Sequence, residues 1–252
     1  METEKNKLFG LVGKNISYSF SRSYFSEKFQ KLGVSNYEYV NFDIPSINKL
    51  PTILSERKDN LIGFNVTIPY KGEIISLLDK VDDTAKSIDA VNTVLIESNG
   101  QLKGFNTDIY GFENSFKPLL KPLHQKALIL GTGGASRAIE FVLNKLNIKY
   151  KFVSRNPSVE NQITYSEITK EVMNEFTIII NCTPLGTYPD IEKCPSIPYQ
   201  FLTSDHLLYD LIYNPAETTF LKNGKKVNAT IKNGLEMLEL QAEKAWEIWQ
   251  NR

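Results

Sequence analysis

The pattern of hydrophobic and polar positions divides the chain into two parts. In the first hundred residues, apolar runs typical of strands alternate with amphipathic stretches typical of helices. Gly33 is expected to end the first helix, and Asn99-Gly100 is a strong signal for a tight hairpin turn. The predicted strands are 7–13, 37–42, 61–68, 90–97 and 102–105, and the predicted helices are 20–32, 50–56 and 71–78.

A second pattern begins after a helix that opens at Asp108 and a linker marked by Pro118 and Pro122. Short apolar runs then alternate regularly with helical stretches. Repeated strand–helix–strand units imply a parallel sheet with right-handed crossovers. The predicted strands are 127–130, 150–154, 177–181, 207–212 and 227–231, and the predicted helices are 108–116, 136–147, 166–174 and 216–222.

We therefore predict an α/β protein of two domains, residues 1–105 and 106–234. The final helix, 235–252, carries Trp246 and Trp249 on one apolar stripe. A helix that buries two tryptophans needs a neighbouring surface, so we expect it to pack back on the first domain. A cleft between the two domains is the expected place for a ligand.

Composition and charge exclude several classes of protein. The 29 basic and 29 acidic residues cancel, which gives no long-range attraction to nucleic acid or to an anionic membrane. No apolar run approaches the roughly 18 residues of a membrane span, and the first ten residues lack an apolar signal core. We therefore expect a cytoplasmic protein that acts on a small molecule.

The reactive residues are few. Cys182 and Cys194 lack the spacing of metal ligands and are too few for a disulfide framework. Neither His124 nor His206 lies in a polar cluster. A zinc site or a Ser–His–Asp triad is hard to build from this set, and we expect no metal.

The most informative single stretch is KALILGTGGASRA, residues 126–138. A buried apolar run is followed by Gly131, Gly133, Gly134 and Ala135, and then by a helical pattern. Strand, glycine turn and helix in this order are typical of a dinucleotide-binding loop, whose backbone approaches a pyrophosphate closely. The third small residue of the usual spacing is Ser136. A tight turn without a ligand is the alternative, but the flanking strand and helix favour a nucleotide in a Rossmann-like domain.

The next strand indicates which nucleotide is bound. It ends at Val153-Ser154-Arg155, where an NAD-binding protein usually carries Asp or Glu for the ribose 2′-hydroxyl. Arg155 instead offers a planar cation suited to a 2′-phosphate, which favours NADP, although a plain surface arginine is the alternative. The loops 181–186 and 210–215 follow two further strands and are expected near the nicotinamide, or else are ordinary turns.

Polar residues in the first domain fall into small groups. Ser17 and Ser19 point the same way in an extended chain and suit a carboxylate or a hydroxyl, but they also suit a helix cap. Asn65 and Thr67 share one face of an apolar strand that ends shortly before Lys71. The alternative for this group is an edge strand followed by a solvated lysine.

Two further polar residues complete the set. Asn92 lies inside an otherwise apolar strand, and Asp108 begins a helix. Asp108 could serve as a helix cap, and a carboxylate could also tether a lysine ammonium and tune its pKa.

Taken together, these stretches resemble the shikimate dehydrogenase family, whose members use NADP to reduce 3-dehydroshikimate on the route to chorismate and the aromatic amino acids. The resemblance runs from Gly13 to Ala242. The most specific stretches are NVTIPYK (65–71), AVNT (90–93), GFNTDIYG (104–111), GTGGA (131–135), NCTPLG (181–186), YNPAET (213–218) and NGLEMLELQA (233–242).

The resemblance implies an N-terminal substrate-binding domain, a C-terminal NADP-binding domain and a role for each candidate residue. Lys71 and Asp108 correspond to the catalytic pair. The substrate-binding residues are Ser17, Ser19, Asn65, Thr67, Asn92, Tyr213 and Gln241. The cofactor-binding residues are Gly131, Gly133, Gly134, Ala135, Ser154, Arg155, Thr183, Leu211 and Gly234. We expect a monomer or a homodimer.

The sequence departs from the family at two places. Phe20, Ser23 and Tyr24 stand where the family usually has Pro and then His-Asn, and residues 157–160 lack the second basic residue of the 2′-phosphate loop. The second departure weakens the expected preference for NADP. Two alternatives follow: a quinate/shikimate dehydrogenase that uses NAD, and a cofactor-binding regulator without catalysis. Retention of both Lys71 and Asp108 argues against the regulator.

Overall fold

The computed structural model describes residues 6–17 and 19–252. Part of the segment expected to lack a signal core, residues 1–5, therefore lies outside the described residues. The chain forms two compact units. The first unit comprises Met1–Thr107 and Ala242–Arg252, and the second comprises Asp108–Gln241.

The first unit is built on a six-stranded mixed sheet in the order β2-β1-β3-β5-β6-β4. β1, β2 and β3 are parallel, whereas β5 pairs antiparallel with both β3 and β6. The strands are β1 (Lys7–Gly13), β2 (Tyr37–Asp43), β3 (Leu61–Val66), β4 (Lys80–Val81), β5 (Thr93–Ile96) and β6 (Leu102–Phe105). The helices are α1 (Phe20–Leu32), η1 (Ile47–Lys49), α2 (Leu50–Glu56), η2 (Glu73–Leu77), α3 (Asp83–Ser87) and the C-terminal part of α8 (Leu235–Gln250).

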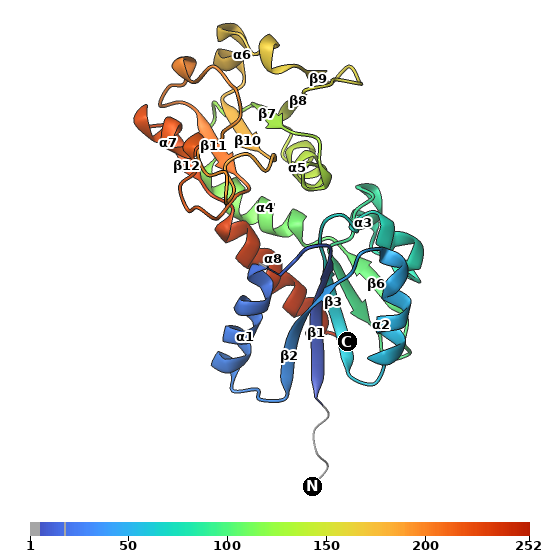
Figure 1. The fold of residues 1–252 in the computed structure, drawn as a ribbon. Coiled ribbons are helices and arrows are strands. Elements are labelled where there is room, and N and C mark those ends of the chain that lie inside the picture. Colours follow the sequence, from blue (N-terminus) through green and yellow to red (C-terminus); the bar gives the residue numbers. More distant parts are fainter. Residues whose placement is uncertain (1–5, 18) are drawn as a thin grey trace. The chain divides into compact units, whose positions relative to one another are not determined.

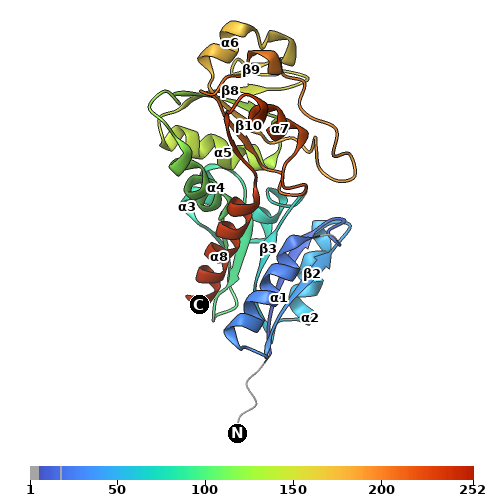
Figure 2. The ribbon, with the colours of Figure 1, turned by 90° about the vertical axis from the view of Figure 1, so that its left-hand side faces the viewer.

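Apolar side chains cover both faces of this sheet. On one face α1 and the C-terminal part of α8 bury an aromatic cluster with Phe9, Phe25 and Trp249 at its centre. On the other face α2 and the segments around η2 and α3 cover a second, mainly aliphatic cluster. Figures 1 and 2 show α1 lying along β2. The first unit is therefore a three-layer α/β/α sandwich.

The second unit has six parallel strands in the order β12-β11-β10-β7-β8-β9. Its strands are β7 (Lys126–Leu130), β8 (Lys149–Val153), β9 (Gln162–Ile163), β10 (Ile178–Asn181), β11 (Leu207–Asp210) and β12 (Thr230–Lys232). Its helices are α4 (Asp108–Phe116), η3 (Lys117–Leu119), α5 (Gly134–Lys145), η4 (Tyr165–Glu167), α6 (Lys170–Glu175), η5 (Tyr199–Phe201), α7 (Thr219–Lys226) and the N-terminal part of α8.

This strand order is that of the Rossmann fold, with the direction of winding reversed between β7 and β10. Figure 2 shows α5 and α6 on opposite sides of the sheet. Ligands of such sheets bind beyond the carboxyl ends of the strands where the winding reverses. That position is occupied here by the glycine turn after β7 and the loop after β10.

Several predicted elements are confirmed, and others are shorter than predicted. The helices predicted at 20–32, 50–56 and 108–116 are observed with those bounds. The helix predicted at 71–78 is a 3-10 helix, Glu73–Leu77, and the one predicted at 166–174 is divided into η4 and α6. Thr169 caps α6 and so starts a new helix inside the predicted one.

The bounds of the strands and the short connecting elements were harder to predict than the long helices. The strand predicted at 90–97 is reduced to β5, Thr93–Ile96. The helix predicted at 216–222 begins later, at Thr219, because Thr218 caps it. β4, α3 and β9 are short elements that the pattern did not predict. Among the described residues, no helix has both the length and the apolar character needed to cross a membrane.

Candidate functional site

The serine loop after β1 is held by two side chains of β2. Asp43 pairs in register with Gly13 at the carboxyl ends of the two strands. Its carboxylate accepts from the backbone N–H groups of Asn15 (2.8 Å) and Ile16 (3.1 Å). The amide of Asn41 donates to the carbonyl of Ile16 at 3.0 Å, and the Ile16 side chain is buried. These contacts hold the loop from Gly13 to Ile16 in place.

Both candidate serines lie on this loop. Ser17 is exposed, and Ser19 is the N-cap of α1, accepting from the N–H of Ser21 at 3.2 Å. Within the first unit, Ser19 therefore acts as a helix cap, which is one of the two roles considered for it. A capping hydroxyl accepts through oxygen and keeps its hydrogen for a further partner, so capping and ligand binding are compatible.

Asn65 and Asn92 belong to one buried network. Asn65 accepts from the hydroxyl of Tyr39 (2.9 Å) and donates to the hydroxyl of Thr93 (3.0 Å). Asn92 accepts from the backbone N–H of Thr107 (2.7 Å). All five side chains are less than a tenth exposed, and buried polar groups joined in this way hold one another in a single geometry.

Tyr39, Thr93 and Thr107 were missed by the sequence reasoning. The two threonines follow an asparagine in AVNT and in GFNT, so those stretches contained the signal. Nothing in the sequence distinguished Tyr39 from the other aromatic residues of its strand. Burial raises the pKa of the Tyr39 hydroxyl, which therefore stays protonated and donates to Asn65.

The turn that carries Lys71 is anchored on both sides. Tyr70 is buried, and its hydroxyl donates to the carbonyl of Ile44 at 2.8 Å. The carbonyl of Lys71 itself accepts from the N–H of Val91 at 2.8 Å, while the Lys71 side chain is half-buried. Thr67, also half-buried, accepts through its carbonyl from the N–H of Tyr70. The backbone from which the Lys71 side chain extends is therefore held in place.

Asp108 is the first residue of α4 rather than the cap before it, and it is buried. Within the second unit, α4 and the start of α8 approach closely. A Cβ on Gly111 would lie 2.4 Å from the carbonyl oxygen of Met237 and 3.2 Å from the Cβ of Gln241. Gln241, half-buried, ends the part of α8 that belongs to this unit.

The glycine turn after β7 leaves the start of α5 open. Gly131 has a φ of +97°, which favours glycine. A Cβ on Gly133 or Gly134 would meet nothing within 4 Å, and Gly133, the N-cap, makes no side-chain capping hydrogen bond. Ser136, in place of a third glycine, is buried and donates to the Gly133 carbonyl at 2.7 Å. A helix start with no side-chain cap and with open space beside Gly133 and Gly134 fits a pyrophosphate.

The loop after β8 presents Arg155 to solvent. Ser154 accepts from the N–H of Asn156 at 3.2 Å, which shapes the turn around the exposed Arg155. The carboxyl end of β10, on the other side of β7 from β8, leads into the loop of Thr183, where the Thr183 hydroxyl donates to Asn181 at 2.7 Å. Tyr213 lies half-buried after β11.

The backbones of Leu211 and Gly234 are in close contact. A Cβ on Gly234 would lie 2.1 Å from the Leu211 carbonyl oxygen, so only glycine fits there.

Comparison with known proteins decides the family. A model of the shikimate dehydrogenase substrate binding domain matches residues 11–94. A relative from Methanococcus vannielii, named shikimate dehydrogenase (NADP(+)), is 39% identical over 268 residues, covering 99% of this chain and 93% of the relative.

The chain belongs to the shikimate dehydrogenase family.

Solved structures of shikimate dehydrogenases have the same fold. One in complex with NADP+ has a TM-score of 0.86 at 35% identity, covering 100% of this chain and 92% of that one. The shikimate dehydrogenase of Thermus thermophilus, in complex with NADP(H) and shikimate, has a TM-score of 0.84 at 30% identity, covering 98% of this chain and 94% of that one.

The two histidines have structural roles in this member of the shikimate dehydrogenase family. His124 accepts from the N–H of Lys121 (3.0 Å) through Nδ1 and donates to the carbonyl of Asp205 (3.0 Å) through Nε2. Burial lowers the pKa of His124 and of His206, and burial raises that of the Cys182 thiol. The described part of the chain contains no group of three or more His, Cys, Asp or Glu side chains placed to hold a metal.

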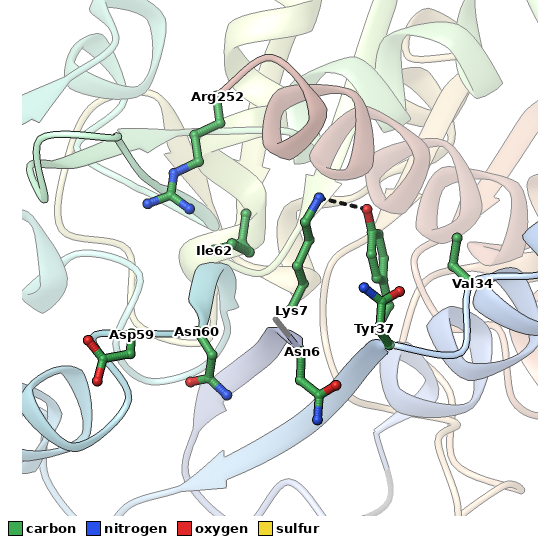
Figure 3. Close-up of a pocket in the computed structure, with 9 residues that line it drawn as sticks. Asn6, Lys7, Val34, Tyr37, Asp59, Asn60, Ile62 and Arg252 are labelled. Atoms are coloured by element: carbon green, nitrogen blue, oxygen red, sulfur yellow. Dashed lines mark hydrogen bonds between the residues drawn. The ribbon is translucent and has the colours of Figure 1, made fainter. Parts of the chain in front are cut away.

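A cavity of about 330 Å³ in the first unit lies away from these shikimate dehydrogenase motifs. Figure 3 shows Lys7, Tyr37 and Asn60 around it, with the Lys7 ammonium donating to the Tyr37 hydroxyl at 2.8 Å. These residues stand at the amino ends of β1, β2 and β3. The candidate residues stand at the carboxyl ends, so this cavity is not part of the candidate site.

Proposed function

We propose that this protein is an NADP-dependent shikimate dehydrogenase, which interconverts 3-dehydroshikimate and shikimate. The observation that carries the proposal is the similarity over 99% of the chain to a shikimate dehydrogenase (NADP(+)). The open N-terminus of α5 and the exposed Arg155 support a phosphorylated dinucleotide.

The cofactor residues fit NADP in their chemistry. Gly131, Gly133, Gly134 and Ala135 would present backbone N–H groups to the pyrophosphate. Arg155 and the Ser154 hydroxyl would hold the 2′-phosphate, because a guanidinium forms two parallel hydrogen bonds with phosphate oxygens. Thr183, Leu211 and Gly234 would border the nicotinamide. When bound, NADPH supplies the hydride that reduces the ring ketone.

The substrate residues have the groups that shikimate requires. We propose that Ser17 and Ser19 donate to its carboxylate from the loop fixed by Asp43. Asn65, Thr67, Asn92, Tyr213 and Gln241 would bond its ring hydroxyls. Because Asn65 and Asn92 belong to a rigid network, the network sets the positions available to these hydroxyls.

We propose that Lys71 and Asp108 carry the proton chemistry. The Lys71 ammonium would stabilise the negative charge that develops on the ketone oxygen and donate a proton to it, forming the hydroxyl of shikimate. In the reverse direction the amine would remove that proton. Asp108 would accept a hydrogen bond from Nζ and so orient it. Lys71 suits this role because the backbone of its turn is held in place by hydrogen bonds.

Steady-state assay of the purified protein tests the function. We expect oxidation of shikimate with NADP, and lower kcat/KM with NAD or with quinate. Comparable turnover of quinate with NAD would instead establish the quinate/shikimate alternative. Binding of NADPH without turnover of any of these substrates would establish the regulator.

Lys71→Ala tests the catalytic role. Positioned acid–base groups contribute about 10² to 10⁴-fold, so we expect kcat to fall at least about a hundredfold with a much smaller change in KM. Lys86→Ala, at an exposed lysine of α3 in the same unit, is the matched control and should leave kcat unchanged. Near-normal kcat in Lys71→Ala would remove this lysine from the chemistry.

We also propose a monomer or homodimer located in the cytoplasm. This proposal rests on the sequence and on the small-molecule substrate, and light scattering of the purified protein tests the oligomeric state.

A further inference from the structure

Two buried polar side chains end neighbouring strands of the second unit. Asn181 is the last residue of β10 and Asp210 the last of β11, and the two are paired in register. Both are fully buried. The amide of Asn181 donates to the carboxylate of Asp210 at 3.0 Å. The pair therefore lies at the carboxyl edge of the sheet, where this fold binds its ligands.

Asp210 fixes the segment that follows β11. Oδ1 accepts from the N–H of Ile212 at 3.1 Å, and Oδ2 accepts from the hydroxyl of Thr218 at 2.6 Å. Thr218 is in turn the N-cap of α7, and its side chain is buried. One carboxylate thus holds both ends of residues 211–218, which include Leu211 and Tyr213.

Asn181 fixes the loop that follows β10. Its Oδ1 accepts from the N–H (3.0 Å) and the hydroxyl (2.7 Å) of Thr183, and its amide also donates to the carbonyl of Leu185 at 3.4 Å. Thr183 in turn packs against the glycine turn, since a Cβ on Gly131 would lie 3.0 Å from Thr183 Cγ2. The Asn181–Asp210 pair consequently reaches the three segments that follow β7, β10 and β11.

Packing alone does not explain a carboxylate at this position. Asp210 is held by three hydrogen bonds from neutral donors and forms no ion pair with the described lysines and arginines. A buried carboxylate without a cation costs folding free energy that an apolar residue would not. What the carboxylate offers is two acceptor oxygens that join two loops.

We propose that Asp210, acting with Asn181, is a positioning residue that holds segments 182–185 and 211–218 in the geometry that binds the nicotinamide end of NADP. The inference rests on the proposed function. Tyr213, a proposed substrate residue, also lies on segment 211–218, so loss of the pair should weaken NADPH binding strongly and recognition of shikimate to a smaller extent.

Asp210→Ala and Asp210→Asn test the proposal together, with NADPH fluorescence titration as the binding measurement. Alanine removes all three acceptor contacts, and we expect NADPH affinity to fall about tenfold or more, since tenfold corresponds to roughly 1.4 kcal/mol. Asparagine keeps the shape and one acceptor oxygen, so we expect affinity within about threefold of the parent. KM for shikimate should rise less than NADPH affinity falls, because Tyr213 is the one proposed substrate residue on the segments that the pair holds.

Two further variants keep the test decisive. Thr218→Val removes the hydrogen bond to Asp210 and the weaker cap on the Leu221 N–H, and it keeps the shape of the side chain. It replaces Asp210→Ala if that variant does not fold, and we expect weaker NADPH binding. Asp205→Ala, at an exposed aspartate before the amino end of β11, is the matched control and should bind NADPH normally.

The outcomes separate this proposal from the proposed function. A parent protein that neither binds NADPH nor oxidises shikimate refutes the function. A parent that does both, with unchanged NADPH affinity in folded Asp210→Ala or in Thr218→Val, overturns the positioning role. An equal rise in KM for shikimate and for NADP would also overturn it, because that result indicates general loosening of the fold.

Discussion

At the scale of single residues, we propose that the cation after β8 selects the cofactor. Arg155 is exposed, and no acidic residue stands at the end of that strand. A charge-assisted hydrogen bond contributes about 1.5–3 kcal/mol, so we expect Arg155→Ala to raise KM for NADPH by roughly tenfold or more and to leave KM for NADH nearly unchanged. Lys151→Ala, at an exposed lysine on the same strand, is the control. Equal effects on both cofactors would show that Arg155 does not contact the 2′-phosphate.

A second residue connects folding stability to pH. Burial raises the pKa of Asp210 from 3.8 to about 6, although its three hydrogen bonds oppose the shift. The folded protein then retains a proton between about pH 4 and 6 that the unfolded chain has released. Stability therefore falls as pH rises through this window, by on the order of 3 kcal/mol, and the loss is complete above about pH 6.

Asp210→Asn removes the titrating group and keeps its shape. We expect the variant to gain stability relative to the parent as pH rises from about 4 to 7. Urea unfolding at several pH values measures this difference. A difference in unfolding free energy that is independent of pH would contradict the assignment of the shift to Asp210.

At the scale of elements, the C-terminal part of α8 completes the core of the first unit. Trp249 is 1% exposed, and its indole N–H donates to the carbonyl of Val94 at 3.0 Å. A Cβ on Gly63 would lie 2.3 Å from the same nitrogen, so the glycine makes room for the indole. The helix is therefore part of this core rather than an appendage.

Trp249→Phe tests that role. The change removes the indole donor and leaves unfilled volume, and we expect the unfolding free energy to fall by about 2–4 kcal/mol. Trp246→Phe, at a half-buried position on the same helix, should cost much less. Urea unfolding followed by circular dichroism compares the two, and equal losses would contradict a special role for Trp249.

At the scale of the whole molecule, we propose that the two units contribute different parts of the binding site. Most candidate substrate residues belong to the first unit, and Tyr213 and Gln241 belong to the second together with the candidate phosphate-binding residues. Ligand binding stabilises the segments that it contacts and slows their hydrogen exchange.

Hydrogen–deuterium exchange with mass spectrometry tests this division. We expect NADPH to slow exchange in residues 131–135, 181–186 and 211–218, and shikimate to slow it in 13–19 and 65–71. The amino ends of the strands, which lie opposite the candidate residues, serve as the internal control. Protection by NADPH confined to the first-unit segments would contradict the division.

Much of the fold could be predicted because its signals are local. The helix 20–32 has its cap at Ser19 and its stop signal at Gly33, and both act within a few residues. The glycine turn predicted a ligand loop because positive φ and the absence of a side chain are properties of the residues themselves. The short helix predicted at 71–78 is present over Glu73–Leu77 as a 3-10 helix, and the apolar pattern did not specify the type of helix.

The sequence by itself therefore determined the class of fold, the order of elements, the dinucleotide loop and the family resemblance, because each depends on spacing along the chain. Only the tertiary structure decided which polar residues meet: Asp43 with the serine loop, Tyr39 with Asn65, and Asn181 with Asp210. The partners in these contacts are between 26 and 29 residues apart along the chain, and strand pairing brings them together. Burial then gives such contacts their strength, and burial is a property of the folded chain.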